Sequence, residues 1–152
     1  MLNISQSDYD QIRREAEQAY PHECCGILLG TMDAASRTIT ATVPCDNMSH
    51  EAPERRYSID PQQVIAAMKL ARTRGENIIG FYHSHPGHPA QYSATDLAEA
   101  HWMDCSYVII SVEEGRAMDT TAFVLRGSED NQRFEPEEIQ ILPAHALGKI
   151  EI

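Results

Sequence analysis

The sequence predicts an α/β fold in which a mixed β-sheet is flanked by helices. Segments with apolar residues at helical spacing alternate with short apolar runs that are rich in β-branched and aromatic residues. Their order is helix, strand, strand, helix, strand, helix, strand, strand, followed by a tail with further strand-like pieces. At 152 residues the chain is expected to form one domain over residues 1–152.

Three helices are predicted from their end signals. The first covers residues 5–20, begins with a serine N-cap and stops at a proline. The second covers residues 60–74, begins with an Asp-Pro pair and stops at a glycine. The third begins at a serine and covers residues 93 to about 102.

The strands are predicted from short runs of Val, Ile, Thr and aromatic residues between turn signals. The first two form a hairpin, and the polar stretch of residues 45–55 is interpreted as a mobile loop. The predicted strands are residues 23–30, 36–44, 56–59, 77–85, 106–112 and 117–125, with further pieces near Phe134 and at 139–142.

Composition restricts the class of protein. The net charge of −11 argues against partners such as nucleic acid or anionic membranes, which bind basic patches. There is no N-terminal signal pattern and no apolar run of roughly 20 residues, so a cytoplasmic location is expected. The four cysteines form no CxxC pair and predict buried thiols rather than a disulfide framework.

Two histidines end the central predicted strand. His83 and His85 are two residues apart, so on a strand their side chains share a face. Two imidazoles at a strand end can form half of a zinc site, although a lone His-x-His is a weak signal. The glycine and prolines that follow allow the chain to turn back sharply.

Asp96 and Glu23 are the acidic candidates. Ser93 and Asp96 match a capping box at the start of the third helix, so Asp96 becomes a metal ligand only if this helix start folds back over the histidines. Glu23 heads a strand face that is otherwise apolar. It is either an exposed carboxylate at the rim of the sheet or a base that activates a water on a three-ligand zinc.

His88 leaves a second pattern open. With His83 and His85 it matches part of the His-x-His-x-Asp-His motif of metallo-β-lactamase-like hydrolases, but Gly87 stands where that motif has aspartate, and the chain is short for that fold. The simpler interpretation is a loop histidine near the mouth of the site.

Taken together, these residues resemble the signature of the JAMM (MPN-plus) metalloproteases. The pattern is an upstream glutamate, Glu23, then His83-Ser84-His85-Pro86, then Ser93 and Asp96. The resemblance implies the cytidine-deaminase-like α/β sandwich of MPN domains. It implies one Zn²⁺ held by His83, His85 and Asp96, with Glu23 activating a water and Ser93 stabilising the oxygen of the tetrahedral intermediate.

Members of this family hydrolyse amide bonds after the C-terminal Gly-Gly of ubiquitin or ubiquitin-like proteins. The small size and the Pro-His-Glu-Cys-Cys-Gly run resemble stand-alone prokaryotic members that act on ubiquitin-like sulfur-carrier proteins and release an amino acid such as cysteine or a short peptide. Homodimerisation is left open. Two alternatives also stand: a non-catalytic MPN scaffold, and a zinc hydrolase of a small-molecule amide.

Overall fold

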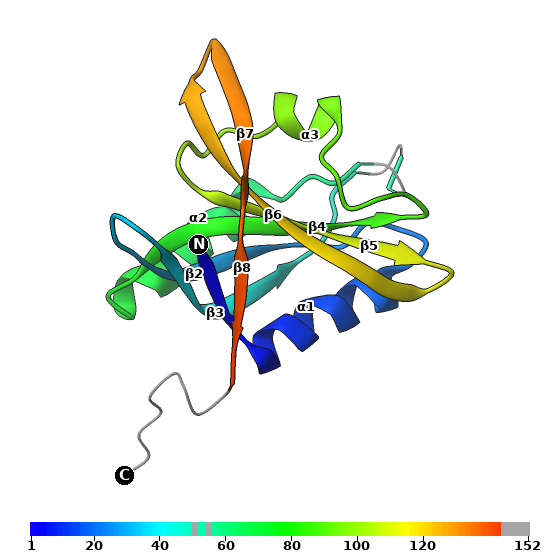
Figure 1. Cartoon of the computed structure of the whole chain (residues 1–152), viewed down its shortest axis with the longest axis horizontal. Helices are drawn as coiled ribbons and strands as arrows, with labels where there is room; N and C mark the ends of the chain where they lie inside the picture. The colour runs from blue at the N-terminus through cyan, green and yellow to red at the C-terminus, as the bar shows by residue number, and fades with distance from the viewer. Residues whose placement is uncertain (50–51, 54–55, 144–152) are drawn as a thin grey trace.

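A computed structural model describes residues 1–49, 52–53 and 56–143 of the chain. The strands form one mixed sheet in the order β7-β6-β5-β4-β2-β3-β1-β8, which is strongly curled, and the predicted α/β class is confirmed (Figure 1). The elements are β1 (Leu2–Ser5), α1 (Gln6–Ala19), β2 (Cys25–Met32), β3 (Arg37–Cys45), α2 (Pro61–Thr73), β4 (Asn77–Pro86), α3 (Ala94–Ala98), β5 (Ser106–Glu113), β6 (Arg116–Ser128), β7 (Asn131–Glu137) and β8 (Ile139–Leu142).

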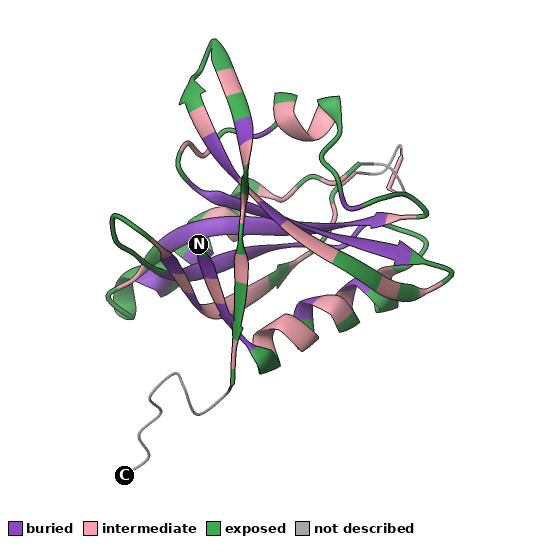
Figure 2. Ribbon diagram, in the orientation of Figure 1, coloured by how far each residue is buried: buried purple, intermediate pink, exposed green. Residues whose placement is uncertain are grey.

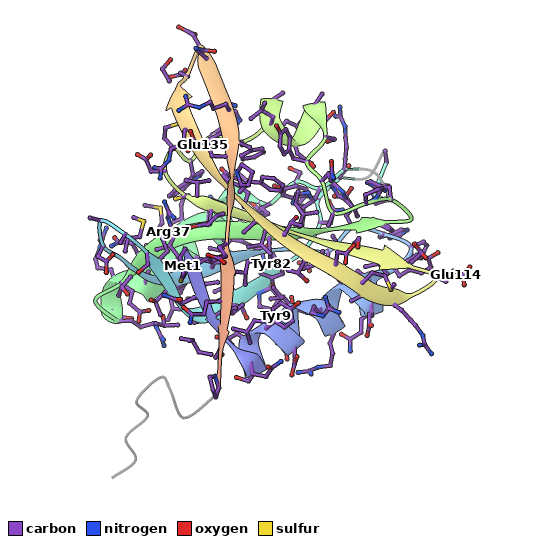
Figure 3. All side chains as sticks on the ribbon, in the orientation of Figure 1. Met1, Tyr9, Arg37, Tyr82, Glu114 and Glu135 are labelled. Atoms are coloured by element: carbon purple, nitrogen blue, oxygen red, sulfur yellow. The ribbon has the colours of Figure 1, made fainter. Side chains whose placement is uncertain are left out.

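The sheet separates two apolar cores. On one face, α1 packs its buried Ile12 and Ala16 against alternate residues of the central strands, including Tyr82. Figure 3 shows Tyr82 on this side of the sheet, near Tyr9 of α1. On the other face, α2 packs Ala67 and other residues over a core that contains Phe81. Because side chains alternate along a strand, His83 and His85 lie on the α2 face with Phe81.

Strand β4 is the structural centre of the molecule. It is antiparallel to β2 and parallel to β5, and the residues from Ile78 to His85 are all buried (Figure 2). Parallel pairing with β5 requires a crossover connection, and the segment that contains α3 provides it. This connection returns the chain past the end of β4, where the two histidines lie.

The observed helices and strands agree with most of the predicted elements, with three differences. Strand β1 was not predicted, and it pairs in parallel with β3 and β8. The third helix ends at Ala98 rather than near 102, because the side-chain amide of Gln132 donates to the carbonyls of Leu97 and Ala100 at 2.6 and 2.9 Å.

The predicted strand at residues 56–59 is wrong. Both sides of β2 are already paired, with β3 and β4, so this segment cannot pair beside β2, and its Tyr57 packs on His83 instead. Its backbone bonds elsewhere: the Ser58 carbonyl accepts from the Met48 N–H at 2.8 Å.

The predicted loop at 45–55 falls partly outside the described residues, at 50–51 and 54–55. No helix in the described part of the chain combines the length and the apolar character that crossing a bilayer requires.

Gly80 lets β4 and β5 approach closely, and this predicts a sensitive position. A Cβ added at Gly80 would lie 2.3 Å from the backbone oxygen of Ser106. Gly80→Ala should therefore separate the two strands and lower the free energy of unfolding by about 1–3 kcal/mol. Urea unfolding of the variant measures this directly, and a stability equal to that of the unsubstituted protein would contradict the strand spacing described here.

Candidate metal centre

The two histidines are fixed by the sheet. His83 pairs with Cys25 of β2 and Ile109 of β5, and both imidazoles are almost fully buried. The Nδ1 atom of His85 lies 2.8 Å from the carbonyl oxygen of Pro89, which suits an Nδ1–H donor and leaves Nε2 with its lone pair. His83 has no equivalent support, since its buried Nδ1 has no partner among the described residues.

Asp96 reaches both histidines from the first turn of α3. Its Oδ1 lies 3.3 Å from Nε2 of His83, and its Oδ2 lies 3.0 Å from Nε2 of His85. The same Oδ2 accepts the backbone N–H of Ser93 at 2.9 Å. The helix start is therefore folded back over the histidines, and Asp96 caps α3 while contributing to the cluster.

The separations within this cluster suit a small divalent cation. The Nε2 atoms of His83 and His85 are 3.2 Å apart, and Asp96 lies at similar distances from each. Ligands at 2.0–2.1 Å from a tetrahedral zinc ion are themselves about 3.3 Å apart. Two imidazoles and a carboxylate are also a ligand set that zinc accepts in catalytic sites. The residues present therefore fit a zinc ion.

In the metal-free cluster, the pKa shifts of His83 and Asp96 favour the protonation states that ligands need, while that of His85 favours its protonated form. Burial disfavours a charge on His83 and lowers its pKa, so this imidazole is held neutral. For His85, burial acts in the same direction, but hydrogen bonds to Asp96 and Pro89 outweigh it and raise the pKa. Burial opposes the Asp96 carboxylate too, yet its hydrogen bonds with both histidines keep its pKa well below the usual range.

Glu23 is buried beside the cluster. It precedes the first residue of β2, and only 3% of its surface is exposed, so the interpretation as an exposed carboxylate at the rim of the sheet is wrong. Its Oε1 is buried and has no hydrogen-bond partner among the described residues. Burial raises the pKa of this carboxyl to about 8. A buried acidic group without a partner is uncommon, and it marks Glu23 as a group held for binding or chemistry.

Ser93 lies at the exposed edge of the site. Its Oγ accepts the N–H of Asp96 at 3.0 Å, which completes the capping box that the sequence predicted. The hydroxyl proton of Ser93 is therefore free to donate to another group.

His88 lies nearer to the cluster than its place in a loop suggests. Its ring stacks on His85 with a centroid distance of 4.2 Å. One of its ring nitrogens lies within 4.8 Å of a carboxylate oxygen of Glu23 and of a ring nitrogen of His85. It remains exposed, and its Nδ1 lies 3.0 Å from the Pro86 carbonyl oxygen.

Tyr57 also contacts the cluster, although no sequence pattern predicts it. Its ring stacks on His83 at a centroid distance of 4.4 Å and an interplanar angle of 20°. Tyr57 also lines a cleft of about 910 Å³, together with Phe81, Trp102 and Tyr107. No local pattern identifies this tyrosine, because its contact with His83 joins two segments that are distant in sequence.

Comparison with known proteins identifies the family of this chain. The family model of prokaryotic homologs of the JAB domain matches residues 5–140. This chain belongs to the prokaryotic JAB family. The predicted JAMM (MPN-plus) membership is confirmed, and the α/β fold is that of MPN domains.

Solved structures of similar fold cover almost the whole chain. A protein from Desulfitobacterium hafniense has 30% identity and a TM-score of 0.80, with 94% of each chain covered. A protein from Salinibacter ruber has 37% identity and a TM-score of 0.67, covering 93% of this chain and 90% of that one.

Two relatives have informative names. A desampylase from Haloferax volcanii is 40% identical over 91 residues, which are 60% of this chain and 63% of that protein. The match thus covers less than two thirds of the desampylase. A probable TtuB-protein conjugate cleaving protease from Thermus thermophilus is 29% identical over 117 residues, which are 77% of this chain and 74% of that protein.

The two roles of Asp96 can be separated by mutation. Asp96→Ala removes a candidate metal ligand as well as part of the capping box. If Asp96 binds zinc, zinc affinity should fall by more than about 100-fold, since outer-shell residues alone contribute about 10–100-fold. Ser93→Ala removes only the other half of the capping box and should keep zinc affinity, with a stability loss of about 1 kcal/mol. Zinc titration against a competing chelator distinguishes them. If both variants bind zinc as tightly as the parent protein, Asp96 serves only as a cap.

The raised pKa of Glu23 predicts how the stability of metal-free protein depends on pH. Between the ordinary pKa of 4.5 and about 8, the unfolded chain releases the proton while the folded chain keeps it, so stability falls as pH rises. Glu23→Gln removes this titration, and at pH 8 it should be more stable than its parent by a few kcal/mol, at about 1.4 kcal/mol per pKa unit. At pH 4 the two should be equal.

Denaturant unfolding at both pH values measures this difference. The exposed Glu129→Gln is the control, and it should leave the profile unchanged. A parent protein that gains stability between pH 5 and 8 relative to Glu23→Gln would contradict the burial described for Glu23.

Proposed function

We propose that this chain is a zinc-dependent peptidase that cuts the amide bond after the C-terminal Gly-Gly of a ubiquitin-like sulfur-carrier protein. The released group is an amino acid such as cysteine or a short peptide. The main support is the convergence of His83, His85 and Asp96 at ligand spacing beside Glu23, whose buried Oε1 has no partner among the described residues. The names of the relatives support the peptidase class, since both describe cleavage activities, one of them on protein conjugates.

The residues around the cluster suit amide hydrolysis. His83, His85 and Asp96 would hold the zinc ion, and when bound, zinc supplies a water that ionises near neutral pH and a Lewis acid for the scissile carbonyl. Glu23 would accept a proton from that water and later donate it to the leaving nitrogen. Ser93 would donate its free hydroxyl proton to the carbonyl oxygen as negative charge develops on it, a type of contact that contributes about 3–4 kcal/mol.

The neighbouring cleft provides room for an extended peptide. Tyr57 contacts both His83 and the cleft, so the cleft opens directly beside the cluster. Its lining is largely aromatic and aliphatic, with Arg56 and Glu99 near one another at 4.0 Å. Because glycine carries no side chain, a Gly-Gly terminus would need little room beside Tyr57 to reach the site. A flexible carrier tail is a substrate that this arrangement would accept.

The name of the Thermus thermophilus relative favours a second substrate class. That protein is named for cleaving protein conjugates, which suggests an isopeptide bond to lysine as the scissile bond. The catalytic groups would be the same, and only the leaving amine differs. A non-catalytic scaffold and a hydrolase of small-molecule amides are the remaining alternatives, and the first has no need of a buried Glu23.

Glu23→Gln tests the proposed reaction. The variant should bind zinc like the parent protein but lose turnover by about 100-fold or more, because it removes the proton acceptor and leaves every ligand in place. The assay is hydrolysis of carrier fusions that carry a cysteine or a short peptide after Gly-Gly, with a lysine-linked conjugate and a small-molecule amide in parallel.

Carriers ending in Ala-Ala serve as the substrate control. Cleavage of Gly-Gly fusions but not of Ala-Ala fusions supports the proposal. Zinc-loaded parent protein that cleaves only the small-molecule amide, or nothing at all, would contradict it, as would full turnover by Glu23→Gln.

A further inference from the structure

A single asparagine organises the segment between β3 and α2. Asn47 is half-buried, and its side-chain amide binds backbone groups on both sides of Tyr57. Its Nδ2 donates to the Arg56 carbonyl at 2.9 Å, and its Oδ1 accepts the Ser58 N–H at 3.1 Å. Oδ1 also accepts the Ser49 N–H at 2.9 Å. The position of Tyr57 is thus set by hydrogen bonds to its two chain neighbours.

The same amide reaches Glu23. Since β2 begins only at Cys25, the Glu23 backbone is not held by the sheet ladder. Its carbonyl accepts from Nδ2 of Asn47 at 3.2 Å, and its N–H donates to the Pro53 carbonyl at 2.7 Å. Nδ2 also approaches that Pro53 carbonyl, at 3.5 Å. Both backbone polar groups of Glu23 are therefore bound by this segment.

Tyr57 supports the other half of the site. A metal-binding histidine usually donates its second ring nitrogen to a partner that fixes the ring. His83 has no such partner among the described residues, and the ring that packs on it is that of Tyr57. Stacking by Tyr57 therefore holds the orientation of His83, whereas His85 is held by the hydrogen bond that its Nδ1–H donates to the Pro89 carbonyl.

We propose that Asn47 is a positioning residue of the site, which couples Glu23 and His83 through one side-chain amide. Asparagine suits this task because it offers two N–H donors and an acceptor in one plane, whereas aspartate offers only acceptors. The predicted effect on turnover rests on the proposed function. The predicted effect on the structure around Glu23 and Tyr57 does not.

Asn47→Asp is the sharpest test, because it keeps the size of the side chain and the acceptor but removes both donors. The kcat for a Gly-Gly fusion should fall about 10- to 100-fold, as expected when a residue that orients a site is changed. In metal-free protein, hydrogen exchange should become faster at the Glu23 amide, because Nδ2 no longer binds the Glu23 and Pro53 carbonyls, and stay unchanged in β5. The emission of Trp102, the one tryptophan of the chain, should also change, since it lines the cleft with Tyr57.

Two further variants separate the parts of this arrangement. Tyr57→Leu removes the stacking on His83, so it should lower zinc affinity about tenfold while leaving exchange at Glu23 slow. Asn77→Asp is the control: Asn77 is exposed at the start of β4, at the opposite end of that strand from His83 and His85, and this variant should change none of the readouts.

The outcomes discriminate clearly. Parent-like kcat together with slow exchange at Glu23 in Asn47→Asp would overturn the role of Asn47. If Asn47→Asp does not fold, parent-like zinc affinity in Tyr57→Leu would overturn the coupling to His83. If the parent protein hydrolyses no Gly-Gly fusion, the proposed function fails, and exchange and Trp102 emission still decide the role of Asn47.

Discussion

The carboxylate of Asp96 is the group on which the site depends. Its oxygens lie at 3.0–3.3 Å from Nε2 of His83 and His85, and one of them also accepts the N–H of Ser93. The carboxylate thereby fixes where α3 begins, and with it the path of the crossover that leaves β4. One side chain thus joins the end of the central strand to the start of the next helix. The same carboxylate caps α3 and contacts both histidines, so the helix start and the cluster are fixed together.

The polar residues of the site are buried in an otherwise apolar face of the sheet. Glu23, His83 and His85 lie on the α2 face beside the core that contains Phe81. Burying such groups costs free energy unless they are paired, and the Oε1 of Glu23 and the Nδ1 of His83 have no partner in the described part of the chain. The backbone pairing of β4 with β2 and β5 offsets this free-energy cost and holds the histidines in place. A divalent cation would recover part of it.

Much of this arrangement could be predicted from local sequence. Helices α1 and α2 followed from their caps and apolar spacing, and the shared face of His83 and His85 followed from the two-residue repeat of a strand. The capping box at Ser93 was visible in the sequence, and its folding over the histidines was the only tertiary step needed. These features depend on residues within a few positions of one another.

Other features could not be predicted, because they depend on contacts between distant segments. The burial of Glu23 is set by the segment after β3, which binds its backbone through Asn47 and Pro53. Residues 56–59 have the alternation of a strand, but both sides of β2 are already paired with β3 and β4, and Tyr57 packs on His83 instead. Such outcomes follow from which strand edges are occupied, and a single sequence does not state this.

Anomalous diffraction at the zinc absorption edge, from crystals grown with one equivalent of zinc per chain, is the most direct test of the central claim. We predict one strong peak about 2.0–2.2 Å from Nε2 of His83, Nε2 of His85 and a carboxylate oxygen of Asp96, with Glu23 outside the ligand sphere. No peak at this position, or zinc bound only elsewhere on the surface, would contradict it.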